Sequence, residues 1–156
     1  MIIGSGDIAK AIQDREGFIF YASGNSNRHP IKPCESDKEV GLDEMFVYFS
    51  TLSIYYSDSE YTKHKIEEEQ EIKRKLVNYC IVRIGNITWG DNPNTIINHL
   101  RKDQSRIDDT YRYLIDQDEL NHWLQLIPRY GKHEFNITGR RMKVSEIVKE
   151  INDGRL

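Results

Sequence analysis

Apolar and polar residues follow one another in blocks along the chain, and the blocks have two different spacings. Short continuous apolar runs are typical of strands buried on both faces of a parallel sheet, whereas apolar residues three or four apart indicate helices. The runs predict strands at residues 2–3, 18–22, 45–51, 79–84, 113–115 and 134–137. The helical spacing predicts helices at 7–15, 61–78, 119–127 and 144–151, and one more that Asn92 caps and that has Pro93 in its first turn.

Strands and helices alternate in most of this order, which predicts an α/β fold. The expected architecture is a parallel sheet with helices on both faces. Right-handed crossovers then bring the loops that follow the strands to one edge of the sheet, where ligands bind in such folds. A site is therefore expected among the residues that follow strands, at 4–9, 23–27, 50–55 and 85–90.

Length, charge and composition narrow the class of protein. A chain of 156 residues can bury a core as a single domain, 1–156, without disulfides or metals. The net charge of −3 argues against a nucleic-acid partner, and no run approaches the ~20 apolar residues of a membrane span. Cys34 and Cys80 match no zinc or redox spacing, and the histidines do not pair as metal ligands. With no secretory signal, a cytoplasmic protein without a metal site is expected.

A glycine-rich turn follows the first predicted strand. Residues 4–9 read Gly-Ser-Gly-Asp-Ile-Ala and fit the pattern G-x-G-x-x-A between a strand and a helix. In dinucleotide-binding folds the first glycine makes a tight turn, the second admits a pyrophosphate, and the small last residue lets helix and strand pack closely. An ordinary strand-to-helix turn is the alternative interpretation, because no acidic residue follows the second strand to hold an adenine ribose.

A tyrosine and a lysine four residues apart begin the longest predicted helix. Tyr61 and Lys65 share one helix face, and an ammonium near a phenol lowers the pKa of the phenol. Such a pair can give or take a proton at a hydroxyl or carbonyl, and Thr51 at the preceding strand end can hydrogen-bond the same oxygen. The alternative is a packing tyrosine beside a surface lysine. The glutamate run at 67–69 is expected to form a solvated face.

Five short segments occur in the order of a known enzyme family. They are Gly4-Ser5-Gly6, Phe20-Tyr21-Ala22-Ser23-Gly24, Ser50-Thr51-Leu52-Ser53-Ile54-Tyr55, Tyr61 to Lys65, and Arg83-Ile84-Gly85-Asn86. Together they resemble the extended short-chain dehydrogenase/reductase family, the NAD-dependent epimerases and dehydratases of nucleotide sugars. The resemblance covers about residues 1–100. It continues more weakly through 112–116, which is similar to the segment where the family's sheet resumes, and through 135–138 and 144–148.

The resemblance implies a truncated Rossmann-like sheet, with a core at 1–103 and a small C-terminal substrate lobe at 104–156. It implies NAD or NADP as cofactor and a nucleotide sugar as substrate. Tyr61 would be the catalytic acid/base, Lys65 would bind the nicotinamide ribose and lower the Tyr61 pKa, and Thr51 would orient the substrate oxygen. The implied cofactor-binding residues are Gly4, Ser5, Gly6, Asp7, Ile8, Ala22, Ser23, Gly24 and Lys65. The implied substrate-binding residues are Ser53 and Asn86.

The chain is shorter than members of this family, which leaves alternatives open. Its first helix leads directly into the equivalent of the family's fourth strand, so the second and third strands and the usual adenine-ribose site are missing. The expected function is an NAD(P)-dependent nucleotide-sugar epimerase, dehydratase or 4-ketoreductase. The alternatives are a degenerate relative that binds a nucleotide sugar or a protein partner without redox chemistry, and an interaction domain. The resemblance also implies a homodimer through the helix from Tyr61 to Asn78.

Overall fold

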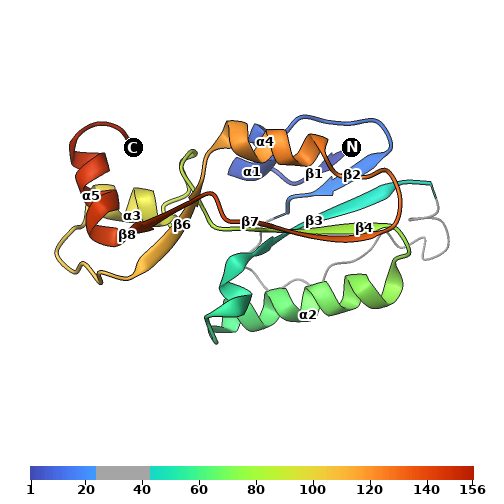
Figure 1. Ribbon diagram of the computed structural model, residues 1–156, viewed down its shortest axis with the longest axis horizontal. Coiled ribbons are helices and arrows are strands. Elements are labelled where there is room, and N and C mark those ends of the chain that lie inside the picture. The colour runs from blue at the N-terminus through green and yellow to red at the C-terminus, as the bar shows by residue number, and fades with distance from the viewer. Residues whose placement is uncertain (24–42) are drawn as a thin grey trace.

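A computed structural model describes residues 1–23 and 43–156, and this part of the chain contains two sheets (Figure 1). The larger sheet has five parallel strands in the order β1 (Ile2–Ile3), β2 (Phe18–Tyr21), β3 (Met45–Thr51), β4 (Tyr79–Ile84) and β7 (Lys132–Ile137). The smaller sheet has the order β5 (Asn86–Ile87), β6 (Tyr111–Ile115) and β8 (Arg140–Lys143). The predicted parallel sheet is confirmed.

Helices cover both faces of the five-stranded sheet. The helices are α1 (Asp7–Ala11), α2 (Glu60–Lys75), α3 (Ile96–Lys102), α4 (Gln117–Gln125), α5 (Val144–Asn152) and a short 3-10 helix, η1 (Leu52–Tyr55). α1 and α4 lie on one face and α2 lies on the other (Figure 1). Successive strand residues point to opposite faces, so Phe18 and Phe20 pack with α1 and α4 while Ile19 packs with α2. None of the helices in the described ranges is long and apolar enough to cross a membrane.

The smaller sheet and two helices form a second packed unit, which we call the small unit. Its core joins α3, β6 and α5 through Ile97, Leu100, Leu114, Val144 and Ile147. The chain enters the small unit after β4, returns to the larger sheet through α4 and β7, and enters the small unit again at β8. Residues on both sides of position 103 therefore contribute to each sheet.

Two elements differ from the sequence prediction because of contacts between distant segments. α1 ends at Ala11 rather than at Arg15, and Ile12 is already extended. The Ala11 carbonyl accepts a hydrogen bond from Asn121 Nδ2 of α4 at 2.8 Å, which replaces a further helical turn. Residues 112–116, expected to resemble the segment where the family's sheet resumes, overlap β6, which lies in the smaller sheet between β5 and β8.

The start of α3 also corrects the sequence analysis, because its N-cap is Thr95 rather than Asn92. The Thr95 hydroxyl accepts a hydrogen bond from the Asn98 N–H at 3.3 Å. Replacing Thr95 with alanine is expected to lower the free energy of unfolding by about 1 kcal/mol. Urea denaturation measures this loss, and Thr110→Ala, at an exposed position outside any helix or strand, is the control with a change near zero. Equal losses in the two variants would contradict the capping role.

Candidate active site

A cavity of about 730 Å³ opens at the carboxyl ends of the parallel strands. Residues that follow β2, the end of β3 and the end of β4 line it, together with the first two turns of α2. The small unit closes one side through Asn86, Thr95 and Arg112. Open parallel α/β sheets bind their ligands at this edge, so the cavity is the candidate active site.

Most of the site residues expected from the sequence meet in this cavity. The expected residues that line it are Ile8, Ala22, Ser23, Thr51, Ser53, Tyr61, Lys65 and Asn86. The expected residues that do not line it are Gly4, Ser5, Gly6 and Asp7. Gly24 lies outside the described residues.

The glycine turn packs against the end of β2. Gly4 has a φ of +130°, and a Cβ there would lie 2.5 Å from the carbonyl oxygen of Ala22, so this position requires glycine. Asp7, at the start of α1, contacts the segment that follows β5. Its carboxylate accepts a hydrogen bond from the Asn92 N–H at 3.0 Å, and its carbonyl accepts one from Trp89 Nε1 at 3.1 Å. Among residues 4–8, the turn thus contributes Ile8 alone to the cavity lining.

Tyr61 and Lys65 lie on one face of α2, as their spacing predicts. The Lys65 ammonium is 5.9 Å from the centre of the Tyr61 ring, and it donates hydrogen bonds to the Tyr48 hydroxyl at 2.9 Å and to the Phe49 carbonyl at 3.3 Å. Burial, and then the Glu68 carboxylate, raise the pKa of Tyr61. The pKa of Tyr61 therefore lies above that of a free tyrosine, so Tyr61 carries its phenolic proton at neutral pH. That Lys65 lowers this pKa stays a prediction.

A row of hydroxyl groups connects the end of β3 to the start of α2. The Thr51 hydroxyl accepts a hydrogen bond from the Ser53 N–H at 3.1 Å and thereby caps η1. It lies 3.1 Å from Ser53 Oγ, which lies 2.8 Å from Thr62 Oγ1, and Thr62 Oγ1 lies 3.0 Å from Ser59 Oγ. Ser59 is the N-cap of α2. The row therefore fixes Thr51 relative to the helix that carries Tyr61.

The glutamate run on α2 differs from the solvated face expected from the sequence. Glu67 is exposed, but the side chains of Glu68 and Glu69 are only 12% and 5% exposed. Glu69 accepts a hydrogen bond from the Ser50 hydroxyl on β3. The signal that sequence reasoning overlooked is spacing, because residues three and four positions after Lys65 share its buried helix face.

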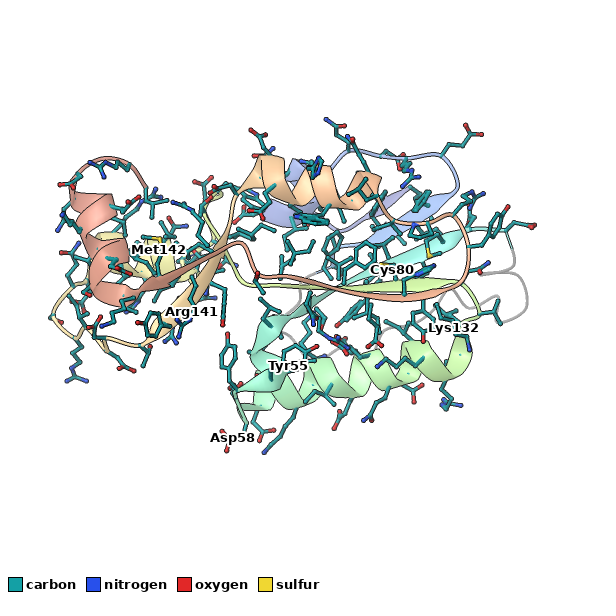
Figure 2. All side chains as sticks on the ribbon, viewed as in Figure 1. Tyr55, Asp58, Cys80, Lys132, Arg141 and Met142 are labelled. Carbon is teal, nitrogen blue, oxygen red and sulfur yellow. The ribbon has the colours of Figure 1, made fainter. Side chains whose placement is uncertain are left out.

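Arg83 joins Glu69 to the outer strand of the sheet. Its guanidinium donates to the Glu69 carboxylate at 2.6 Å and 2.9 Å and also pairs with Glu134 on β7. It donates to the Tyr55 hydroxyl at 3.0 Å and to Asn136 Oδ1 at 3.3 Å. Tyr55 lies on η1, at the end of α2 nearest the small unit (Figure 2). This network ties α2, η1, β4 and β7 together beneath the cavity.

The small unit supplies the cavity with a cation that the sequence did not suggest. Arg112 lines the cavity from β6. The backbones of Gly85 and Tyr113 lie close together beside it, because a Cβ on Gly85 would lie 2.4 Å from the Tyr113 carbonyl oxygen. Asn86 Nδ2 donates a hydrogen bond to that same carbonyl at 3.3 Å. A guanidinium offers paired donors suited to a phosphate or carboxylate, so this side of the cavity suits an anion.

Comparison with known proteins bears on the fold. No family model and no curated protein matches the sequence. WbmG from Bordetella bronchiseptica, solved with NAD and UDP, matches with a TM-score of 0.66 and 14% identity over 89% of this chain and 56% of its own. UDP-glucose 4-epimerase from Thermotoga maritima, solved with UDP-glucose, matches with a TM-score of 0.62 and 17% identity over 89% of this chain and 61% of its own.

The chain has the fold of the NAD-dependent epimerases and dehydratases. CapF from Staphylococcus aureus, a capsular polysaccharide assembling protein, is similar in the same way, with a TM-score of 0.61 and 15% identity over 89% of this chain. The chain spans about half the length of these structures, from 45% to 61%. The truncated Rossmann-like sheet expected from the five ordered segments is therefore confirmed.

Proposed function

We propose that the protein binds a nucleotide sugar together with NAD or NADP in this cavity and acts as an epimerase, dehydratase or 4-ketoreductase. One observation carries the proposal: Thr51, Tyr61 and Lys65, which the resemblance assigns to catalysis, line a single cavity at the carboxyl ends of the strands. The similar structures include one solved with NAD and UDP and one solved with UDP-glucose, which supports this class of ligand.

The residues present fit the nicotinamide end of such a cofactor. Lys65 and Tyr61 would lie beside the nicotinamide ribose, where an ammonium donates to ribose hydroxyls. Ala22 and Ser23 line the same cavity. The resemblance would place the pyrophosphate beside the glycine turn, of which Ile8 lines the cavity. When bound, the nicotinamide takes or returns a hydride at a sugar carbon.

The protein's own residues would handle the proton and the charge. Tyr61 carries its proton at neutral pH, so it can donate that proton to a sugar oxygen as negative charge develops there. Thr51 would donate a hydrogen bond to the same oxygen, held in place by its own bond from the Ser53 N–H. Arg112 would face the diphosphate from the small unit.

Titration with NADH and with NADPH, followed by cofactor fluorescence, tests the proposal. We expect saturable binding of one or both, and an affinity about tenfold weaker in Lys65→Ala, because a charge-assisted hydrogen bond is lost. Lys63→Ala is the matched control, since Lys63 lies on the same helix and its side chain is exposed. A bound cofactor should also raise the melting temperature.

A second candidate function is nucleotide-sugar binding without redox chemistry. It is favoured by Asp7, because a carboxylate bonded to Asn92 at the start of α1 repels a pyrophosphate placed at the glycine turn. In that case UDP-glucose would raise the melting temperature and neither NADH nor NADPH would do so. Binding of a nicotinamide cofactor would exclude this second candidate.

A further inference from the structure

A buried lysine and a buried tyrosine that line the cavity meet a largely buried glutamate, Glu68. Lys65 is 7% exposed, and its ammonium lies 2.9 Å from the Tyr48 hydroxyl and 3.7 Å from Glu68 Oε2. Tyr48, on β3, is 1% exposed and donates its own hydroxyl proton to Glu68 Oε2. The Phe49 carbonyl is a further acceptor for the ammonium, at 3.3 Å. The ammonium is thus held from two elements, β3 and α2.

A buried ammonium needs this support to keep its proton. Desolvation favours the neutral amine, and burial is the main cause that lowers the pKa of Lys65. The Glu68 and Glu69 carboxylates act in the opposite direction. Glu69 is already held by the guanidinium of β4 at 2.6 Å, which leaves Glu68 as the carboxylate placed to balance the Lys65 charge.

We propose that Glu68 is a positioning residue for Lys65. The Glu68 carboxylate keeps the Lys65 ammonium charged and, through Tyr48, directed at the cavity floor. The functional part of this inference rests on the proposed function, because a charged Lys65 is what would bind the ribose hydroxyls of a nicotinamide cofactor. The charge state of Lys65 does not depend on that function and can be measured separately.

Other titratable and charged side chains lie near Lys65, and the test has to take them into account. The titratable and charged groups that surround it are Tyr48 from β3, Tyr61, His64, Glu68 and Glu69 from α2, and Arg83 from β4. His64 Nε2 lies 3.1 Å from Glu68 Oε1, so a protonated imidazole would compete for the same carboxylate. His64 is the same residue in every variant, so comparing the variants at one pH keeps this competitor constant.

The experiment is an NMR titration of the protein labelled with ¹³C at the lysine side chains. Lys65→Arg assigns the Lys65 signal by its disappearance. In Glu68→Gln the amide oxygen can still accept from the Tyr48 hydroxyl, while the negative charge is gone. We expect the Lys65 titration midpoint to fall by about one pH unit or more, since an opposite charge within 4–6 Å shifts a pKa by roughly 1–3. Glu67→Gln, the same change at an exposed neighbour, should leave the midpoint in place.

A second variant covers the case in which Glu68→Gln does not fold. In Glu68→Asp the carboxylate stays but its side chain is one carbon shorter, so the Lys65 titration midpoint is expected to fall by about half a pH unit. Midpoints that stay within about 0.3 pH unit in the folded variants would overturn the positioning role, because the charges would then be uncoupled.

NADH binding at about pH 7 and about pH 9 separates this inference from the proposed function. At the higher pH the Glu68→Gln chain should lose affinity for NADH relative to the unchanged chain, because more of its Lys65 is neutral. A shifted Lys65 midpoint without any NADH binding would support the positioning role and contradict the redox function. NADH binding with equal pH dependence in both chains would overturn the positioning role alone.

Discussion

Arg83→Met is expected to lower the free energy of unfolding by about 3–5 kcal/mol, the largest loss expected for a single substitution outside the cavity. The guanidinium is 7% exposed and Glu69 is 5% exposed, so the substitution leaves a buried carboxylate with the Ser50 hydroxyl as its remaining partner. The same change removes the hydrogen bonds to Tyr55 and Asn136. Urea denaturation at neutral pH measures the loss.

Two further variants test whether the loss of stability comes from the burial of the Arg83–Glu69 ion pair. Arg74→Met breaks an exposed ion pair with Glu71 on the same helix and should cost less than about 1 kcal/mol. A double variant, Arg83→Met with Glu69→Met, should recover a large part of the loss, because neither charge remains buried alone. Similar losses in the Arg83 and Arg74 single variants would show that the pair beneath the cavity is solvated, contrary to the structure.

Tyr61→Phe is expected to reduce turnover by about 100- to 10,000-fold, the range typical of a lost general acid. The variant keeps the ring and removes the one atom that can donate the proton. Because the change removes one hydroxyl and keeps the ring, the melting temperature should stay close to that of the unchanged chain. The loss should fall on kcat rather than on KM, since the proton is transferred in the transition state.

The measurement uses NADH with a UDP-4-keto sugar as the first substrate probe, because Tyr61 donates its proton as the keto oxygen gains negative charge. NADH binding shows whether the site stays intact. Tyr130→Phe is the matched control, because Tyr130 is 60% exposed and lies away from the cavity. Full turnover in Tyr61→Phe would contradict the catalytic role. Equal losses of turnover in both variants would show that the effect comes from a change in the fold and not from the missing phenolic proton.

The main strands were predictable because burial on both faces leaves unbroken apolar runs. β3 and β4 begin and end where those runs place them. The two strands that sequence reasoning missed carry no such run: β5 has two residues, and β8 reads Arg-Arg-Met-Lys. They form because β6 offers both of its edges for pairing, which is a property of the assembled fold.

Helix ends and buried charges depended on partners that lie far away in the sequence. Nothing local ends α1 at Ala11, since the group that replaces its next turn comes from Asn121 on α4. Likewise, Glu69 is buried only because Arg83 arrives from β4 to pair with it. A local pattern of charges cannot distinguish this arrangement from a solvated face.

The sequence was enough to predict those residues of the candidate site whose positions depend on strand ends and on helix spacing. Thr51 ends β3 and Asn86 follows β4, its parallel neighbour, and Tyr61 and Lys65 share a helix face, so their meeting in one cavity follows from the topology. Tyr48 and Arg112 needed the structure, because β3 residues alternate between the two faces and β6 belongs to another sheet. The catalytic roles, the choice between NAD and NADP, and a homodimer through α2 stay predictions.

The chain enters the small unit twice, after β4 and again at β8, and this affects when the small unit can pack during synthesis. β6 emerges from the ribosome before β7 and has to wait for β8, which follows β7, before its second edge is paired. Until then Leu100 and Leu114 lack the partners that bury them. No described residue of β8 or α5 lines the cavity, yet β6 carries Arg112 to it. Loss of β8 and α5 would therefore disturb the ligand site from a distance.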